Sequence, residues 1–215
     1  MKKKIYIIPL VIFSLLLIGA KPLKSFNSPT FFDLSEQAII ESDAFIENGV
    51  KINYCSKTDI EIEYERLLKE FQDKCIDNVE ITNNKIIYKD SNSDITVVLW
   101  EENNETMVEI VVINNNPLME SLLLKRNLEK LLNNNSTKEK YFSYVKGKIE
   151  LQSYEKIEET IMNSIKKDTL EVLNIHNGYS ATAEFRDNQR VNMGYMEYDS
   201  GRQIIIGTPI IFVTY

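Results

Sequence analysis

Apolar residues recur along the chain with the periods of short helices and strands, and the clearest pattern begins at residue 58. A capping box at Thr58–Glu61 starts a predicted helix. Its apolar positions follow at steps of 4, 3, 1, 3 and 4, which place them on one helical face: Ile60, Tyr64, Leu67, Leu68, Phe71 and Cys75. Four strands are expected next, with Asn-rich turns that indicate antiparallel hairpins: Val79–Ile81, Lys85–Lys89, Asp94–Trp100 and Thr106–Ile113.

One helix and one strand are expected before this block. The helix is predicted over Leu34–Glu47, because its apolar residues share a face. Asn48-Gly49 is the expected C-terminal cap of this helix. A strand then follows over Val50–Ser56.

The same order of elements recurs in the second half of the chain. Asn116-Pro117 begins a leucine-rich helix that runs to about Leu132, a strand covers Tyr141–Leu151, and Ser153 caps the next helix. Four further strands are expected, the first pair joined through Asn177-Gly178 and the second through Asp199–Gly201: Leu170–Ile175, Tyr179–Phe185, Val191–Tyr198 and Gln203–Tyr215. Because proline cannot donate to a sheet, Pro209 is expected to bend the last strand into two arms.

Corresponding signals in the two halves lie at a nearly constant offset. Thr58 and Ser153 are 95 positions apart, and Asn83 and Asn177 are 94 apart. We therefore predict an α+β fold with a duplicated α-β-α-β-β-β-β repeat, over residues 34–115 and 116–215. Each repeat would form an antiparallel sheet with helices packed on one face, and the two sheets would join into one curved sheet with an exposed face.

The first 20 residues have the three parts of a secretory signal. Lys2, Lys3 and Lys4 precede an apolar run over Ile5–Ile18, and Gly19-Ala20 supplies small residues for cleavage. A run of 14 residues is shorter than the roughly 20 that a spanning helix needs, which favours a cleaved signal peptide over a retained membrane anchor. A spacer that contains Ser, Pro and Asn is expected over residues 21–33. The protein is therefore expected outside the cytoplasm, secreted or held by this segment.

Charge argues against a nucleic-acid partner. The full chain carries a net charge of −7, and removal of the three lysines of residues 1–20 leaves 22 basic against 32 acidic residues, or −10. Nucleic-acid binders need a basic face that displaces counterions from phosphates.

The chain has two cysteines, Cys55 and Cys75. Export permits a disulfide between them, and two buried reduced thiols are the alternative. No Cys-x-x-Cys motif indicates redox chemistry.

No motif predicts a catalytic, cofactor-binding or metal-binding residue. His176 is the single histidine, so the usual zinc sets and Ser-His-Asp sites are disfavoured. Glycine-rich phosphate loops are absent from the sequence. Two carboxylate pairs stand at i, i+4 on predicted helix surfaces, Glu61 with Glu65 and Glu155 with Glu159. They leave a secreted wall-polymer hydrolase as the alternative function.

Aromatic residues in the long hairpins suggest a binding patch at Trp100, Tyr195 and Tyr198. Trp100 shares a strand face with Thr96 and Val98, opposite a second apolar face. The strand is therefore either covered on both sides or open on one side for a partner.

The C-terminal residues carry a family resemblance. The segments Val191–Tyr198, Asp199–Gly201 and Ile206–Ile211, with Tyr215 at the end, resemble the YwmB-like family of exported proteins from Gram-positive, low-GC bacteria. The resemblance implies a fold like that of the TATA-box-binding protein, but it brings no catalytic motif, and fold alone does not transfer DNA binding. We expect a non-enzymatic envelope module without cofactors. Its exposed sheet face would bind an envelope protein or wall component.

Overall fold

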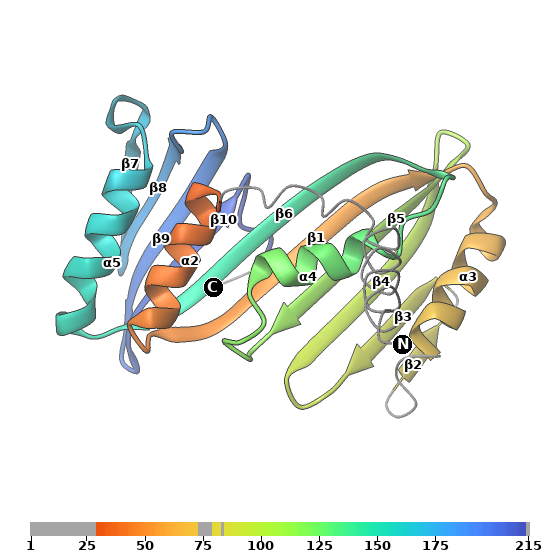
Figure 1. Ribbon diagram of the computed structural model, residues 1–215, viewed down its shortest axis with the longest axis horizontal. Helices are drawn as coiled ribbons and strands as arrows, with labels where there is room; N and C mark the ends of the chain where they lie inside the picture. The colour runs from red at the N-terminus through yellow and green to blue at the C-terminus, as the bar shows by residue number, and fades with distance from the viewer. Residues whose placement is uncertain (1–28, 73–78, 83, 214–215) are drawn as a thin grey trace, which may run out of the picture.

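The computed structural model describes residues 29–72, 79–82 and 84–213. These residues form an α+β fold in which ten strands build one antiparallel sheet, and four α-helices lie on one of its faces (Figure 1). The predicted α+β class is confirmed. None of the helices in this described part combines the length and hydropathy that crossing a bilayer requires.

The helices and strands follow one another in the predicted order. The helices are α2 (Phe31–Glu41), α3 (Ile60–Gln72), α4 (Ser121–Glu129), α5 (Leu151–Ser164) and the short 3₁₀ turn η1 (Lys167–Thr169). The first five strands are β1 (Phe45–Ser56), β2 (Val79–Thr82), β3 (Lys85–Lys89), β4 (Ser93–Glu102) and β5 (Glu105–Asn114). The last five are β6 (Ser136–Ile149), β7 (Glu171–Ile175), β8 (Gly178–Glu184), β9 (Arg190–Tyr198) and β10 (Gly201–Thr208).

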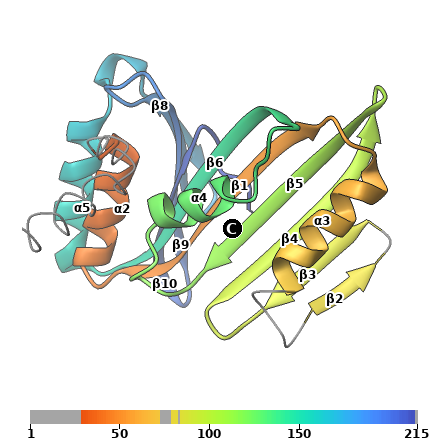
Figure 2. The ribbon, with the colours of Figure 1, turned by 45° about the vertical axis from the view of Figure 1, so that its right-hand side comes forward.

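The strand order across the sheet is β2-β3-β4-β5-β1-β6-β10-β9-β8-β7. The two longest strands, β1 and β6, therefore meet at the centre, and the short strands β2 and β7 form the two edges. Sheets of this size twist and curl, and Figure 2 shows the two ends turned strongly relative to each other.

Two apolar cores lie between the sheet and the helices, one in each half. The core over β6 and β8–β10 contains Ile157 and Ile161 of α5, together with Phe32 and Ile39 of α2. The core over β1 and β3–β5 contains side chains of α3 and of α4, among them Leu67 and Leu124. Each half-sheet is thus covered by one helix from its own part of the chain and one from the other part. This exchange ties the halves together.

Several predicted boundaries are wrong. The first helix spans Phe31–Glu41 rather than Leu34–Glu47, because the capping box at Thr30 starts it early and a turn at Asp43, with a φ of 52°, ends it. Asn48-Gly49 is therefore not a helix cap but lies within β1.

The second half needs similar corrections. α4 begins at Ser121 instead of Asn116-Pro117, since the side chain of Asn116 accepts a hydrogen bond from Leu118 N and holds a separate turn. Ser153 lies within α5 and does not cap it. The β7–β8 turn is His176-Asn177, one residue earlier than expected.

The expected second arm of the last strand is also wrong. β10 ends at Thr208, and residues 210–213 fold back onto the sheet instead of extending it. The signal segment 1–20, residues 21–28 of the spacer, Cys75, Asn83 and Tyr215 lie outside the described residues.

Candidate functional site

The three residues of the expected aromatic patch do not lie together. Trp100 is half-buried on the open, helix-free face of β4, next to Met107 of β5. Tyr198 lies on the open face of β9, which four intervening strands separate from β4 by about 24 Å. Tyr195 is on the other face of β9, beneath α5, because it lies an odd number of residues from Tyr198.

The centre of the open face is covered by the chain's own C-terminal segment. Ile211 packs over Gly207, where an added Cβ would lie 2.8 Å from Ile211 Cγ1. The ring of Phe212 meets that of Tyr144 edge-on, with 5.1 Å between centroids. Lys51 Nζ lies 5.4 Å from the Phe212 centroid. Residues 210–213 thus cross β10, β6 and β1, and they cover the middle of the surface on which a partner was expected.

Charges on the remaining open face are of both signs. Lys51 pairs with Glu109 at 3.1 Å, and Lys138 pairs with Glu105 at 2.6 Å. A basic saddle of the kind that binds duplex DNA would leave such cations free for phosphate.

The predicted carboxylate pairs are exposed on helix surfaces. Glu61 and Glu65 lie on α3, and Glu155 and Glu159 on α5. No group of three or more metal-ligating side chains occurs among the residues that the structure describes. His176 is exposed in the β7–β8 turn.

Two buried carboxylates were not predicted. Glu36 is 2% exposed and joins α2 to the start of α4, since its carboxylate accepts bonds from Asn48 Nδ2 at 2.6 Å and from Ser121 N at 3.1 Å. Burial raises the pKa of Glu36 to about 7, although hydrogen bonds from Asn48 and Ser121 oppose the shift. A sequence search for paired acids misses this residue because its partners are distant in the chain.

Glu63 is the second buried carboxylate, and it fixes α3 to β1. Tyr54 Oη donates to Glu63 Oε1 at 2.8 Å, and Arg66 forms an ion pair with the same oxygen at 2.7 Å. Burial alone would raise the pKa of Glu63, but the bonds from Arg66 and Tyr54 outweigh it and hold the pKa below its ordinary value. Every oxygen of this cluster has a partner inside the protein, so the cluster is structural.

Cys55 is buried on the open side of β1, with its Sγ 3.3 Å from Met107 Sδ. Burial raises the pKa of its thiol. Since Cys75 lies outside the described residues, the disulfide stays a prediction.

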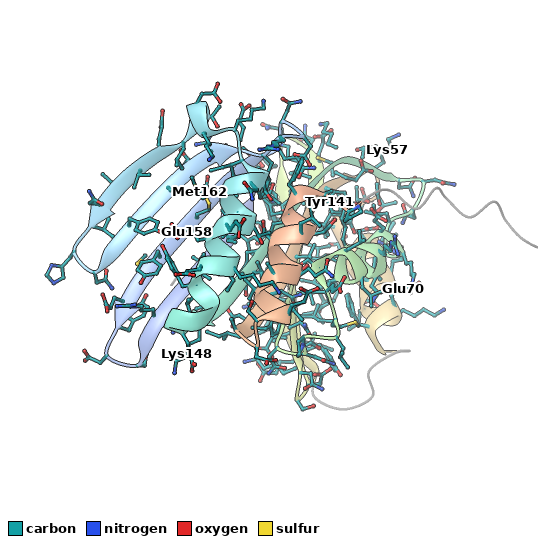
Figure 3. All side chains as sticks on the ribbon, turned by 60° about the vertical axis from the view of Figure 1, so that its left-hand side comes forward. Lys57, Glu70, Tyr141, Lys148, Glu158 and Met162 are labelled. Atoms are coloured by element: carbon teal, nitrogen blue, oxygen red, sulfur yellow. The ribbon has the colours of Figure 1, made fainter. Side chains whose placement is uncertain are left out.

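A largely apolar cavity lies on the helix side, between α5 and strands β7–β9. We call it the α5 groove. It has a volume of about 320 Å³, within the range of ligand sites. Apolar and aromatic side chains dominate its lining, which includes Tyr154, Met162, Leu170, Val172, Tyr179 and Tyr195. In Figure 3, Glu158 and Met162 project from α5 toward these strands.

One end of the α5 groove is aromatic. The rings of Tyr179 and Tyr195 stack with centroids 5.1 Å apart, and Tyr154 meets Tyr195 edge-on at 5.8 Å. Burial raises the pKa of Tyr154, and so do its hydrogen bonds with Tyr179 and Glu158. The carboxylate of Glu158 therefore lies at the aromatic end of the groove, and it is the one charged group in the lining.

The outer wall of the groove is the edge strand β7. Two of its apolar side chains are strongly exposed, Val172 at 56% and Leu173 at 67%. Val172 lines the α5 groove, whereas Leu173 faces the opposite side of the sheet. An edge strand with uncovered apolar side chains is a template for a further strand.

The hydrogen-bonding pattern tells which groups of β7 face outward. Glu197 N donates to Asn177 O, so the backbone of Gly178 is directed away from β9 and toward Ile175 of β7. In an antiparallel ladder this direction alternates. The N–H and C=O groups of Val172 and Asn174 are consequently turned to the outside of the sheet.

Comparisons with protein-family models and with curated proteins give no match for this chain. Functional inference therefore depends on the geometry of the α5 groove and its edge strand. The sequence shows the helical spacing of Tyr154, Ile157 and Ile161, which line the groove, but it does not mark a groove beside them. It could not mark β7 as an edge, since strand order is set by long-range pairing.

Proposed function

We propose that this chain is a non-enzymatic binding module of the cell envelope that captures an extended segment of a partner protein along β7. The observation that carries the proposal is the position of an uncovered edge strand as the wall of an apolar groove. Peptides that add a strand gain affinity from main-chain hydrogen bonds and specificity from pockets for alternate side chains. The β7 edge offers main-chain hydrogen-bonding groups, and the α5 groove offers a pocket for side chains.

The outward groups of Val172 and Asn174 set the register of the added strand. Residues paired across an antiparallel ladder share a face. Partner residues opposite Val172 and Asn174 therefore direct their side chains toward the α5 groove. The residue between them lies on the other face, beside Leu173.

A partner segment suits this edge better than a second copy of the chain. Symmetric pairing of two β7 edges would bring two α5 helices onto the same face of a joined sheet. Their exposed acids Glu155, Glu158 and Glu159 would then approach one another. Like charges that are brought together in this way oppose association.

The location follows from the N-terminal segment. The lysines and apolar run of residues 1–20 support export, as a signal peptide or as an anchor. The partner is then an extracytoplasmic protein. The chain contacts the membrane only through residues 1–20, if this segment is not cleaved.

We also propose that the chain is an internal duplication with a TATA-box-binding-protein-like fold, of the YwmB-like kind. Equivalent pairings in the halves support it: Gly49 pairs with Ile113, and Tyr144, 95 positions after Gly49, pairs with Gly207. The strand order read outward from β1 and from β6 is also equivalent. The open, helix-free face of the sheet is a weaker candidate for partner binding, because residues 210–213 occupy its centre. The alternative function, a wall-polymer hydrolase, has little support from exposed carboxylates on separate helices.

Strand addition can be tested with a display library of random octapeptides selected on the purified full chain. Asn174→Pro removes an outward N–H from an edge position, where proline is tolerated, and Asn174→Ala keeps it. We expect the selected peptides to bind the proline variant about tenfold more weakly than the wild type, because one main-chain hydrogen bond is lost and its partner group is left without a donor. The same peptides should keep their affinity for the alanine variant. Equal binding to both variants, or failure to select any peptide, would reject the proposal.

A further inference from the structure

The chemistry of the α5 groove indicates which segment it would accept. We infer that the partner segment carries a lysine or arginine opposite Asn174 and an apolar side chain opposite Val172, with one residue between them. This inference rests on the proposed strand addition at β7. It adds the side chains that the added strand must present.

The two ends of the groove differ in character. Val172 pairs with Ala181 and lies near Met162 and Leu170, which make that end apolar. Asn174 pairs with Tyr179, at the end where the tyrosine rings and Glu158 meet. A strand added to β7 therefore offers one side chain to each end.

A long basic side chain fits the aromatic end. The added strand would lie two strand spacings, about 10 Å, from the strand of Tyr179. The apolar stems of lysine and arginine extend far enough to lie along this surface while the charged head reaches toward Glu158. Cations are also attracted to the faces of tyrosine rings.

Charge around the groove favours the same choice. Besides Glu158, the exposed surface of α5 carries Glu155 and Glu159. Within the described part of the chain these three carboxylates take no part in ion pairs, which engage other glutamates: Glu41, Glu63, Glu105, Glu109, Glu184 and Glu197. A basic segment would be drawn to this edge and an acidic one repelled.

The octapeptide library supplies the test. We expect the selected sequences to be enriched in a basic residue two positions from an apolar residue. Glu158→Gln should weaken their binding about three- to fivefold, as for one exposed ion pair, whereas Glu155→Gln, on the neighbouring helix surface, should change it by less than about twofold. Added salt should weaken binding to the wild type more than binding to the Glu158→Gln variant.

Failure of this inference can be distinguished from failure of the proposed strand addition. If the selected peptides lose affinity for the Asn174→Pro variant but show no basic preference, or bind the Glu158→Gln variant as well as the wild type, the inference is wrong and strand addition stands. If they bind the Asn174→Pro variant undiminished, the proposed function fails, and this inference fails with it. Circular dichroism of each variant confirms that the comparison is made on folded protein.

Discussion

The ring of Tyr144 on β6 packs against the bare backbone of Gly49, its antiparallel partner on β1. A Cβ at position 49 would meet Tyr144 Cε1 too closely for a nonbonded contact and would lie 2.8 Å from Val112 O. Tyr144 Oη donates to Glu47 at 3.0 Å, and the ring of Phe212 meets the Tyr144 ring edge-on. This contact holds the central seam of the ten-stranded sheet, where its two halves meet.

Substitution of Gly49 should weaken that seam. Gly49→Ala adds one methyl group where the space is filled, and overpacking of this kind costs about 2 kcal/mol of unfolding free energy. Urea unfolding of the wild type and the variant measures the loss. In a Tyr144→Ala background the ring is gone and only the approach to Val112 O at 2.8 Å is left, so the same substitution should cost less there than in the wild type. An equal cost in both backgrounds would mean that the ring of Tyr144 is not the obstacle.

The C-terminal segment should contribute to stability through Phe212. Phe212→Ala removes the ring that contacts Tyr144 and lies near Lys51, and we expect a loss of about 2 kcal/mol, below the usual value for a fully buried phenylalanine. Ile210→Ala in the same segment is the matched control, since Ile210 is 41% exposed and should cost under about 0.5 kcal/mol. Similar losses for the two variants would contradict a specific role of the Phe212 ring.

Glu36 should make the protein less stable as the pH rises through the acidic range. Its carboxyl is protonated in both states well below the unfolded pKa of 4.5. Between that value and the folded pKa of about 7, the unfolded chain releases a proton that the folded chain retains. The free energy of unfolding should therefore fall by up to about 3 kcal/mol across this window.

The slope of this fall is the diagnostic quantity. In Glu36→Gln the decline between pH 5 and about pH 7 should be largely absent, because the side chain no longer titrates. Glu41→Gln, on the exposed face of the same helix, should retain the decline. Denaturant unfolding at several pH values gives both slopes. If the free energy of unfolding of Glu36→Gln declined with pH as steeply as that of the wild type, the decline would belong to another titrating group.

The hairpins and most helices could be predicted because their signals are local. The strand Lys85–Lys89 has the predicted limits, and the helical stripe that begins at Ile60 lies in α3. Turn residues fix a hairpin within a few positions, even though the β7–β8 turn is displaced by one residue.

The remaining features depend on partners distant in sequence. Asn48-Gly49 has the composition of a helix cap, but Asn48 instead bonds to Glu36 and Asn114, and Gly49 gives room to Tyr144. The burial of Glu36 depends on Ser121, 85 residues away. Likewise, the edge position of β7 and the return of residues 210–213 onto the sheet are outcomes of tertiary packing, which local patterns do not encode.

Amide hydrogen exchange on the full chain, with and without a selected octapeptide, tests capture of a segment at β7 most directly. The amides of Val172 and Asn174 should exchange freely in the unbound protein and become protected together when the peptide binds. Protection confined to the open face of the sheet, or no change at these two amides under saturating peptide, would contradict capture at β7.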